Sequence, residues 1–243
     1  MDGGQMSLLN LRSEEKKLPG SAVEIASISK QFNGDYIFGN QASEKLFKEL
    51  SPNYQILHLA IHGETNDSIP EYSNLSFYAK GDTIEDGQLY AFELYNLDLN
   101  ADLAVLSACN TGSGKIVNGE GVMSLGRAFA HAGVRSLLLT RDEVSDATSP
   151  RIIQLFYEEL KKGKRKSDAL RSAKLRFLKE ANNITSDPFY WSSYYTLGDD
   201  SSIEFQRDRT NRTIVIIGST LITPLIVVFL WRKKQRNASS ASI

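Results

Sequence analysis

The stretch Ala101–Gly114, ADLAVLSACNTGSG, decides the expected fold, because a largely apolar run ends abruptly at a lone cysteine. Residues 102–108 are apolar on both faces of an extended chain, which is typical of a buried strand in a parallel sheet. Cys109 follows this strand, and the small and turn-forming residues 110–114 predict a loop. In open α/β sheets, ligands bind and reactions take place at the carboxyl ends of the strands. The thiol therefore stands where a nucleophile would be useful.

Helix and strand patterns alternate along the rest of the chain. Helical spacing covers 20–32, 41–50, 91–96, 121–132, 147–160 and 167–181, and strand patterns cover 35–38, 54–62, 75–79, 88–90, 134–140 and 191–197. The strands at 75–79 and 88–90 are expected to form a small hairpin or two edge strands. Such alternation predicts an α/β fold with a mostly parallel sheet.

Composition limits the classes of function open to this chain of 243 residues. The net charge of −1 gives no general attraction to polyanions, so no direct nucleic-acid partner is expected. A single cysteine excludes an intrachain disulfide, and one cysteine with three histidines offers few candidate ligands for a zinc site. The string TGSGK also fails the spacing of a phosphate-binding loop. We therefore expect no metal and no cofactor.

The stretch Thr213–Trp231, TIVIIGSTLITPLIVVFLW, contains no charged residue. A helix of that length covers roughly 28 Å, close to the thickness of a bilayer's hydrocarbon core. Trp231 and the basic residues after it are typical of an interface anchor. We predict one C-terminal transmembrane helix in contact with the lipid bilayer. The expected localisation is therefore a single-pass membrane protein with a C-terminal anchor, with the side of the main domain left open.

These patterns predict five segments. They are a flexible N-terminal segment at 1–17, an α/β domain at 18–200, a juxtamembrane linker at 201–212, the transmembrane helix at 213–231 and a basic tail at 232–243. The lysine-rich run at 161–166 is expected to be a solvated turn between two helices, with contact to anionic lipid headgroups as the alternative.

The expected strand at 54–62 ends in a histidine, as the later strand ends at a cysteine. A thiolate attacks a carbonyl carbon, and a neighbouring histidine can act as its base. Parallel strands ending in His62 and Cys109 would bring both side chains to one sheet edge. His58 lies on the same expected strand and faces the same side, so only the strand end favours His62. The backbone N–H groups of Gly63 and Cys109 could share an oxyanion hole. The alternative is an inert buried cysteine.

Several strings carry a resemblance to a known family. They are LHLAIHG (57–63), LSACNTGSG (106–114), GEGVMSLGRAFAHAGVRSLLL (119–139), DATSPRIIQLFYEELKKG (146–163), Ala169–Ala173 and DPFYWSSYYTLGD (187–199). Together they resemble the CHAT family of caspase-like cysteine peptidases, in the clan of caspases, gingipains and separases. The resemblance implies a caspase-like three-layer α/β sandwich with a mostly parallel central sheet. It also implies a catalytic dyad of His62 as base and Cys109 as nucleophile, with His58 as a structural core residue.

The resemblance further implies a pocket for the substrate's P1 side chain. Related peptidases that cleave after Arg or Lys carry an acidic residue on the segment that here is TRDEVSD (140–146). Asp146 matches the family's recurrent aspartate, and Glu120 is a second candidate. A carboxylate there would select a basic side chain through a charge-assisted pair. The alternative is that Asp146 caps a helix beginning at Ala147.

Two departures from the family pattern define the competing hypotheses. Thr140, Arg141 and Asp142 replace an SLW-like string, and the chain starts close to the first matched helix, so part of the domain's N-terminal region is expected to be missing. The first hypothesis is a membrane-anchored cysteine endopeptidase that cleaves protein substrates, with regulatory protein partners. The alternative is a non-catalytic or conditionally activated signalling or scaffold module on a membrane.

Overall fold

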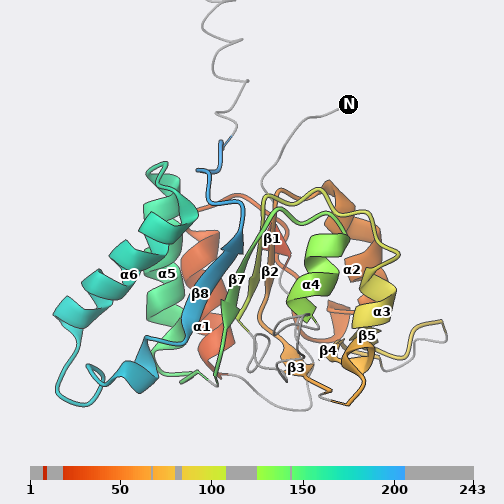
Figure 1. Ribbon diagram of the computed structural model, residues 1–243, viewed down its shortest axis with the longest axis horizontal. Helices are drawn as coiled ribbons and strands as arrows, with labels where there is room; N and C mark the ends of the chain where they lie inside the picture. Colours follow the sequence, from red (N-terminus) through yellow and green to blue (C-terminus); the bar gives the residue numbers. More distant parts are fainter. Residues whose placement is uncertain are drawn as a thin grey trace, which may run out of the picture. The chain divides into compact units, whose positions relative to one another are not determined.

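A five-stranded sheet forms the centre of the fold (Figure 1). The computed structural model describes residues 8–9, 19–66, 68–79, 84–107, 125–142 and 144–205. The chain divides into two units, 1–205 and 206–243, and every described residue belongs to the first. The strand order is β1 (Leu8–Leu9), β2 (Ile56–Leu59), β6 (Leu103–Leu106), β7 (Ser136–Thr140) and β8 (Tyr194–Gly198). Only β8 among them is antiparallel to its neighbour, so the predicted mostly parallel α/β sheet is confirmed.

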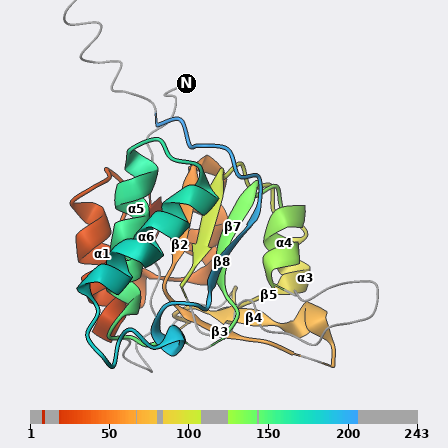
Figure 2. The ribbon, with the colours of Figure 1, turned by 60° about the vertical axis from the view of Figure 1, so that its left-hand side comes forward.

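Helices cover both faces of this sheet, which explains why β2, β6 and β7 are buried at every position (Figures 1 and 2). One face packs against α1 (Pro19–Ser29), α5 (Ser149–Lys161) and α6 (Lys166–Glu180), and the other against α2 (Glu44–Leu50), α3 (Ala91–Leu94) and α4 (Leu125–His131). Ile56 and Val105 face the first group, whereas Leu57 and Leu106 face the second. The layers are therefore helix, sheet, helix.

A second, smaller sheet lies beyond the carboxyl end of β2 (Figure 2). It is antiparallel and consists of β3 (His62–Glu64), β4 (Asn74–Ser76) and β5 (Gln88–Tyr90). The predicted pairing between 75–79 and 88–90 is thus confirmed. Gly87 enters β5 at φ +80°, and a Cβ there would lie 2.5 Å from the Ala79 side chain, so only glycine fits.

The single strand predicted at 54–62 is wrong. β2 ends at Leu59, the buried residues Ala60 and Ile61 form a bend, and β3 begins at His62 in the other sheet. The two histidines of LHLAIHG therefore lie in different sheets. The alternation of side chains along a single strand therefore does not determine whether these two histidine side chains point the same way.

Other expected boundaries also shift. The segment 1–17 was expected to be loose, yet Leu8 and Leu9 pair with Ile56 and Leu57 as strand β1. Residues 35–38 form no strand. Helix α5 begins two residues later than expected, with Pro150 in its first turn, where a missing N–H costs nothing.

The predicted membrane localisation is corrected by the structure. Within the described part of the chain, no helix has both the length and the apolar character needed to cross a membrane. The predicted transmembrane helix at 213–231, with its bilayer contact, and the basic tail at 232–243 lie outside the described residues.

The lysine-rich turn at 161–166 is more than a solvated loop. Lys166 is buried, and its ammonium group donates to the backbone oxygens of Asp199 and Ser201 at 3.1 and 2.9 Å. Burial of Glu159 opposes its ionisation, but hydrogen bonds from Lys162 and neighbouring cations lower its pKa to about 2. These lysines hold α5, α6 and the segment after β8 together.

Candidate active site

The carboxyl edge of the parallel sheet brings together the segments expected to carry the site. Ala60 follows β2, Ser107 follows β6 and Asp146 follows β7, and all three line one small cavity with the start of α1. The backbone N–H of Ser107 donates to the Leu59 carbonyl at 3.1 Å, so β2 and β6 stay paired to this edge. Cys109 comes two residues after Ser107 and lies outside the described residues, as does Glu120.

His62 stands at the beginning of β3, two residues after Ala60. Its side chain is half-buried, and its backbone is in register with Ser76 of β4. Gly63 follows, in register with Leu75. The bend after β2 therefore carries the histidine from the buried sheet to the rim of the same carboxyl edge.

His58, four residues earlier, is fully buried between α1 and α5. Its Nε2 lies 2.6 Å from Glu24 Oε1, and its Nδ1 lies 3.0 Å from the Tyr157 hydroxyl. Burial, followed by the negative charge of Glu24, raises the pKa of Tyr157 well above its ordinary value, so the phenol keeps its proton. Each ring nitrogen of His58 thus lies within 3.0 Å of a side-chain oxygen. Its burial confirms the implied structural role.

Glu24 extends this contact into a buried polar network that the sequence analysis missed. Ser149 Oγ donates to Glu24 Oε2 at 3.4 Å, and the Tyr194 hydroxyl donates to Ser149 Oγ at 2.6 Å. The network joins α1, β2, α5 and β8. Its signal in the sequence is a single acid in the apolar helix pattern 20–32, because a buried carboxylate requires partners.

Asp146 is exposed on the segment that follows β7. The N-cap residue of α5 is Thr148, so the alternative that Asp146 caps this helix is wrong. The backbone around Asp146 presses against α1, where a Cβ on Gly20 would lie 2.4 Å from the Asp146 carbonyl oxygen. Asp146 also lines a groove of about 540 Å³ with Val23 and Gln154, between α1 and α5.

The departure at 140–142 leaves the strand intact. Thr140 is buried and is the last residue of β7, in register with Tyr194 of β8. Arg141 and Asp142 are exposed, and Arg141 Nε lies 3.2 Å from Asp142 Oδ2. The two charges therefore face solvent beyond the strand end.

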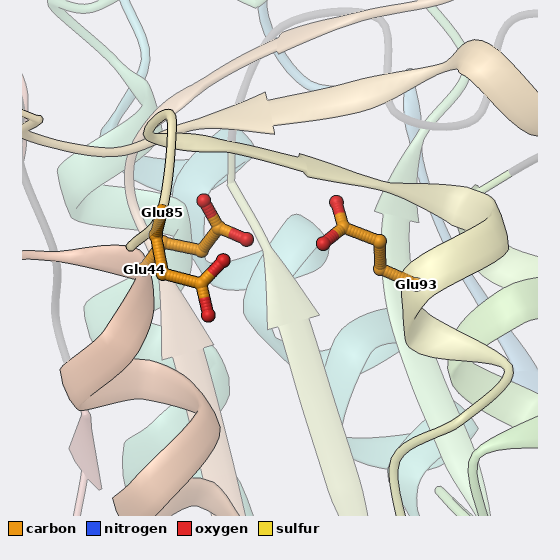
Figure 3. Close-up of side chains that lie close together, drawn as sticks. All are labelled: Glu44, Glu85 and Glu93. Atoms are coloured by element: carbon orange, nitrogen blue, oxygen red, sulfur yellow. The ribbon is translucent and has the colours of Figure 1, made fainter. Parts of the chain in front are cut away.

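Three carboxylates near the small sheet have the spacing of a metal site. Glu44, Glu85 and Glu93 each offer an oxygen within 4.8 Å of the others, and Figure 3 shows the carboxylates gathered around one space. The Lys48 ammonium already lies 2.6, 2.9 and 2.9 Å from them. Burial raises the pKa of Glu44 to about 7, although Lys48 opposes this shift. We assign no metal here, because an internal cation holds the position.

This cluster also positions β5. Glu44 Oε2 accepts the Gly87 backbone N–H at 3.1 Å, and Glu93 Oε2 accepts the Tyr90 backbone N–H at 3.0 Å. Both ends of β5 are thereby tied to α2 and α3. These two hydrogen bonds therefore anchor the small sheet, which carries His62, to helices α2 and α3.

The CHAT domain family matches residues 6–199, about four fifths of the chain. The chain belongs to the CHAT domain family. This confirms the resemblance carried by the quoted strings. The match begins at residue 6 and thus includes strand β1, ahead of the expected domain start at residue 18.

Curated relatives of this CHAT domain include tetratricopeptide repeat protein 28 of Mus musculus and of Homo sapiens. They are 30% and 31% identical over 112 residues. The aligned part is 46% of this chain but only 4% of each relative. The chain thus spans a small fraction of the relatives that it matches.

Solved structures of similar fold include a cysteine proteinase. The Arg-specific cysteine proteinase gingipain R superposes with a TM-score of 0.56 at 10% identity, over 82% of this chain and 47% of that chain. The complex of Porphyromonas gingivalis RgpB pro- and mature domains gives 0.54 at 11% identity, over 82% and 48%. At this identity the likeness shows the fold alone. The CHAT domain therefore shares its fold with these cysteine proteinases.

Proposed function

We propose that this CHAT domain is a cysteine endopeptidase that cleaves protein substrates with His62 and Cys109. The observation that carries the proposal is the meeting of Ala60 and Ser107 in one cavity at the carboxyl edge of the sheet. His62 and Cys109 each follow one of these residues by two positions. The fold shared with gingipain R supports the same chemistry.

In the proposed reaction, Cys109 attacks the carbonyl carbon of the scissile bond as a thiolate. His62 takes the thiol proton and gives it to the departing amine as the C–N bond breaks. The backbone N–H groups of Gly63 and Cys109 stabilise the negative oxygen of the tetrahedral intermediate. Water, deprotonated by His62, then hydrolyses the thioester. This step releases the carboxylate product and restores the thiol.

The proposed substrates carry Arg or Lys at P1. Asp146 supports this, since the residue lines the edge cavity and is exposed. A carboxylate pairs with a guanidinium or ammonium group through charge-assisted hydrogen bonds. Gingipain R, of the same fold, is Arg-specific. Glu120 is the second candidate for this role.

The test is a peptide-library cleavage assay on the full chain, with Cys109→Ala as the matched control. We expect cleavage after basic residues and labelling by a thiol-directed probe, both lost in the control. Cleavage that persists in Cys109→Ala, or no Cys109-dependent cleavage of any library member, would contradict the proposal.

A second candidate function is a CHAT-type signalling or scaffold module that is non-catalytic or needs a protein activator. The observation that favours it is that the curated relatives are named for their tetratricopeptide repeats. On this reading the chain binds protein partners at the same sheet edge. An unreactive Cys109 in the probe assay, with a folded chain, would favour this candidate over the peptidase.

A further inference from the structure

The small sheet has one face in the core and one face turned outward. Leu75 and Leu89 are adjacent in register and fully buried. Side chains alternate along strands, so the neighbouring positions point the other way. His62, Gln88 and Tyr90 therefore share the outward face, together with Ser76 and with Asn74, which is covered by its neighbours. The candidate base stands at one corner of this face.

Three aromatic side chains gather at the opposite corner, and we call them the aromatic corner. Tyr90 and Phe92 stack with ring centroids 5.3 Å apart, and the Tyr72 ring is steeply inclined to both, with its centroid 5.9 and 5.6 Å from theirs. Tyr72 is 53% exposed and Phe92 is 41% exposed. Exposed aromatic clusters of this kind are typical of binding surfaces, because their rings bury large areas on contact.

The surroundings of the aromatic corner are acidic. Partial burial, followed by the negative charges of Asp86 and Glu93, raises the pKa of Tyr90. Asp86 is exposed, and so is Glu64 on the outward face. The nearby cluster adds three carboxylates around the single ammonium of Lys48. A cation would be attracted here both by the charges and by the aromatic ring faces.

Asn74 supplies an independent sign of a missing ligand. It lies between Glu64 and Tyr90 in register, on the middle strand. Only 8% of it is exposed, and its Oδ1 finds no hydrogen-bond donor within the described part of the chain. A buried acceptor without a donor costs free energy, which a bound donor would recover.

The spacing across the face matches an extended peptide. From His62 to Tyr90 the path crosses two strand gaps of about 4.8 Å and two residue steps of about 3.4 Å, which gives about 12 Å between backbones. An extended peptide advances about 3.4 Å per residue. A peptide cleaved beside His62 would thus place its third or fourth residue at the aromatic corner.

We propose that the outward face of the small sheet binds the substrate on one side of the scissile bond. The aromatic corner receives an Arg or Lys side chain three or four residues from that bond. This inference rests on the proposed peptidase function. It adds a second requirement for a basic residue, separate from the P1 position near Asp146.

The first experiment measures kcat/KM of the full chain for pairs of peptides that differ only in Arg or Gln at each position around one cleavable bond. We expect Arg at the third or fourth position on one side to raise kcat/KM about tenfold. In Phe92→Ala and Tyr72→Ala the Arg-to-Gln ratio falls toward one. Phe189→Ala removes another exposed aromatic, on the η4 turn (Pro188–Tyr190), and keeps the ratio. An unchanged ratio in Phe92→Ala and Tyr72→Ala, or no preference in the parent chain, overturns the inference.

The second experiment separates this inference from the proposed function. A fluorescently labelled peptide spanning both corners, with Arg or Gln at the tested position, is titrated with Cys109→Ala and followed by anisotropy. Tighter binding of the Arg peptide, lost in Cys109→Ala/Phe92→Ala, supports the aromatic corner even if the parent chain cleaves nothing. Equal binding of the two peptides overturns it, even if cleavage is observed.

Discussion

His58 and His62 are four residues apart, but their surroundings differ in almost every respect. His58 lies in the middle layer, buried between two helices, with both ring nitrogens in contact with partners. His62 lies half-buried at the start of a small sheet whose outward face meets solvent. One histidine helps to hold the layers together. The other is partly exposed at the start of a separate sheet.

The difference arises from two residues. Ala60 and Ile61 are buried and form the bend that ends one strand and starts another in a second sheet. The central strands of the first sheet are buried at every position, whereas the second sheet has a partly exposed face. The stability of this fold and its proposed chemistry should therefore respond to different substitutions.

The largest effect that distinguishes the two histidines is expected for His62→Ala. We expect kcat/KM for a cleaved peptide to fall about 1,000-fold, because the thiol loses its base. The melting temperature should change little, since the side chain is only half-buried. His131→Ala is the matched control, because His131 is exposed at the end of α4. A loss below tenfold in His62→Ala would remove His62 from the catalytic dyad.

The opposite result is expected for His58→Ala. It leaves the buried Glu24 without its closest partner, and we expect a loss of about 3 kcal/mol in the free energy of unfolding, measured in urea. Glu24→Ala should lower the free energy of unfolding less in the His58→Ala variant than in the parent chain, because the two side chains act as a pair. Purely additive losses would show that the contact contributes no coupling.

A third test removes the lysine at the centre of the carboxylate cluster that anchors the small sheet. Lys48→Met leaves Glu44, Glu85 and Glu93 facing one another, and we expect a loss of about 2 kcal/mol at pH 8. The loss should be smaller at pH 5. In the parent chain burial raises the pKa of Glu44 to about 7 while Lys48 lowers it, so removing Lys48 raises this pKa further, and the variant loses additional stability as the pH rises through this range.

Urea unfolding at both pH values measures this effect. Lys45→Met on the same helix is the control, because Lys45 is exposed and its ammonium nitrogen lies 4.0 Å from Glu49 Oε1. We expect it to change stability by no more than about 0.5 kcal/mol. Equal losses for Lys48→Met at pH 5 and pH 8 would contradict the role of carboxylate repulsion.

The smallest expected effect concerns specificity. Asp146→Asn should reduce the preference for Arg or Lys over Gln at P1 about tenfold, while stability stays the same. Competitive cleavage of matched peptides measures the ratio. Asp142→Asn is the control, since Asp142 is exposed and beyond the end of β7. An unchanged ratio in Asp146→Asn would exclude its carboxylate from the P1 pocket.

Much of the fold follows from patterns that burial imposes on the sequence. Continuous apolar runs predicted β6 and β7, because both of their faces are covered. The bend at Ala60 was missed because LHLAIHG remains apolar through it, and apolar pattern alone does not show where pairing changes partners. Strand β1 was missed because two residues are too short for any periodicity.

The candidate site was predicted less completely than the fold. Motif resemblance indicated His62, which lies at the start of β3 in the second sheet and not at the end of the predicted strand. It did not indicate Glu24 or the aromatic corner, since those depend on contacts between distant segments. Tyr72 and Phe92 are 20 residues apart and meet only after β4 and β5 have paired.

The close packing of Gly20 against Asp146 has a mechanical consequence. The backbone of α1 touches the backbone at Asp146 with no side chain between them to absorb a displacement. A shift of the helix start would therefore also displace the Asp146 backbone. Gly20 and Asp146 both line the groove between α1 and α5, so a partner that moved α1 from this groove would move the segment after β7 as well.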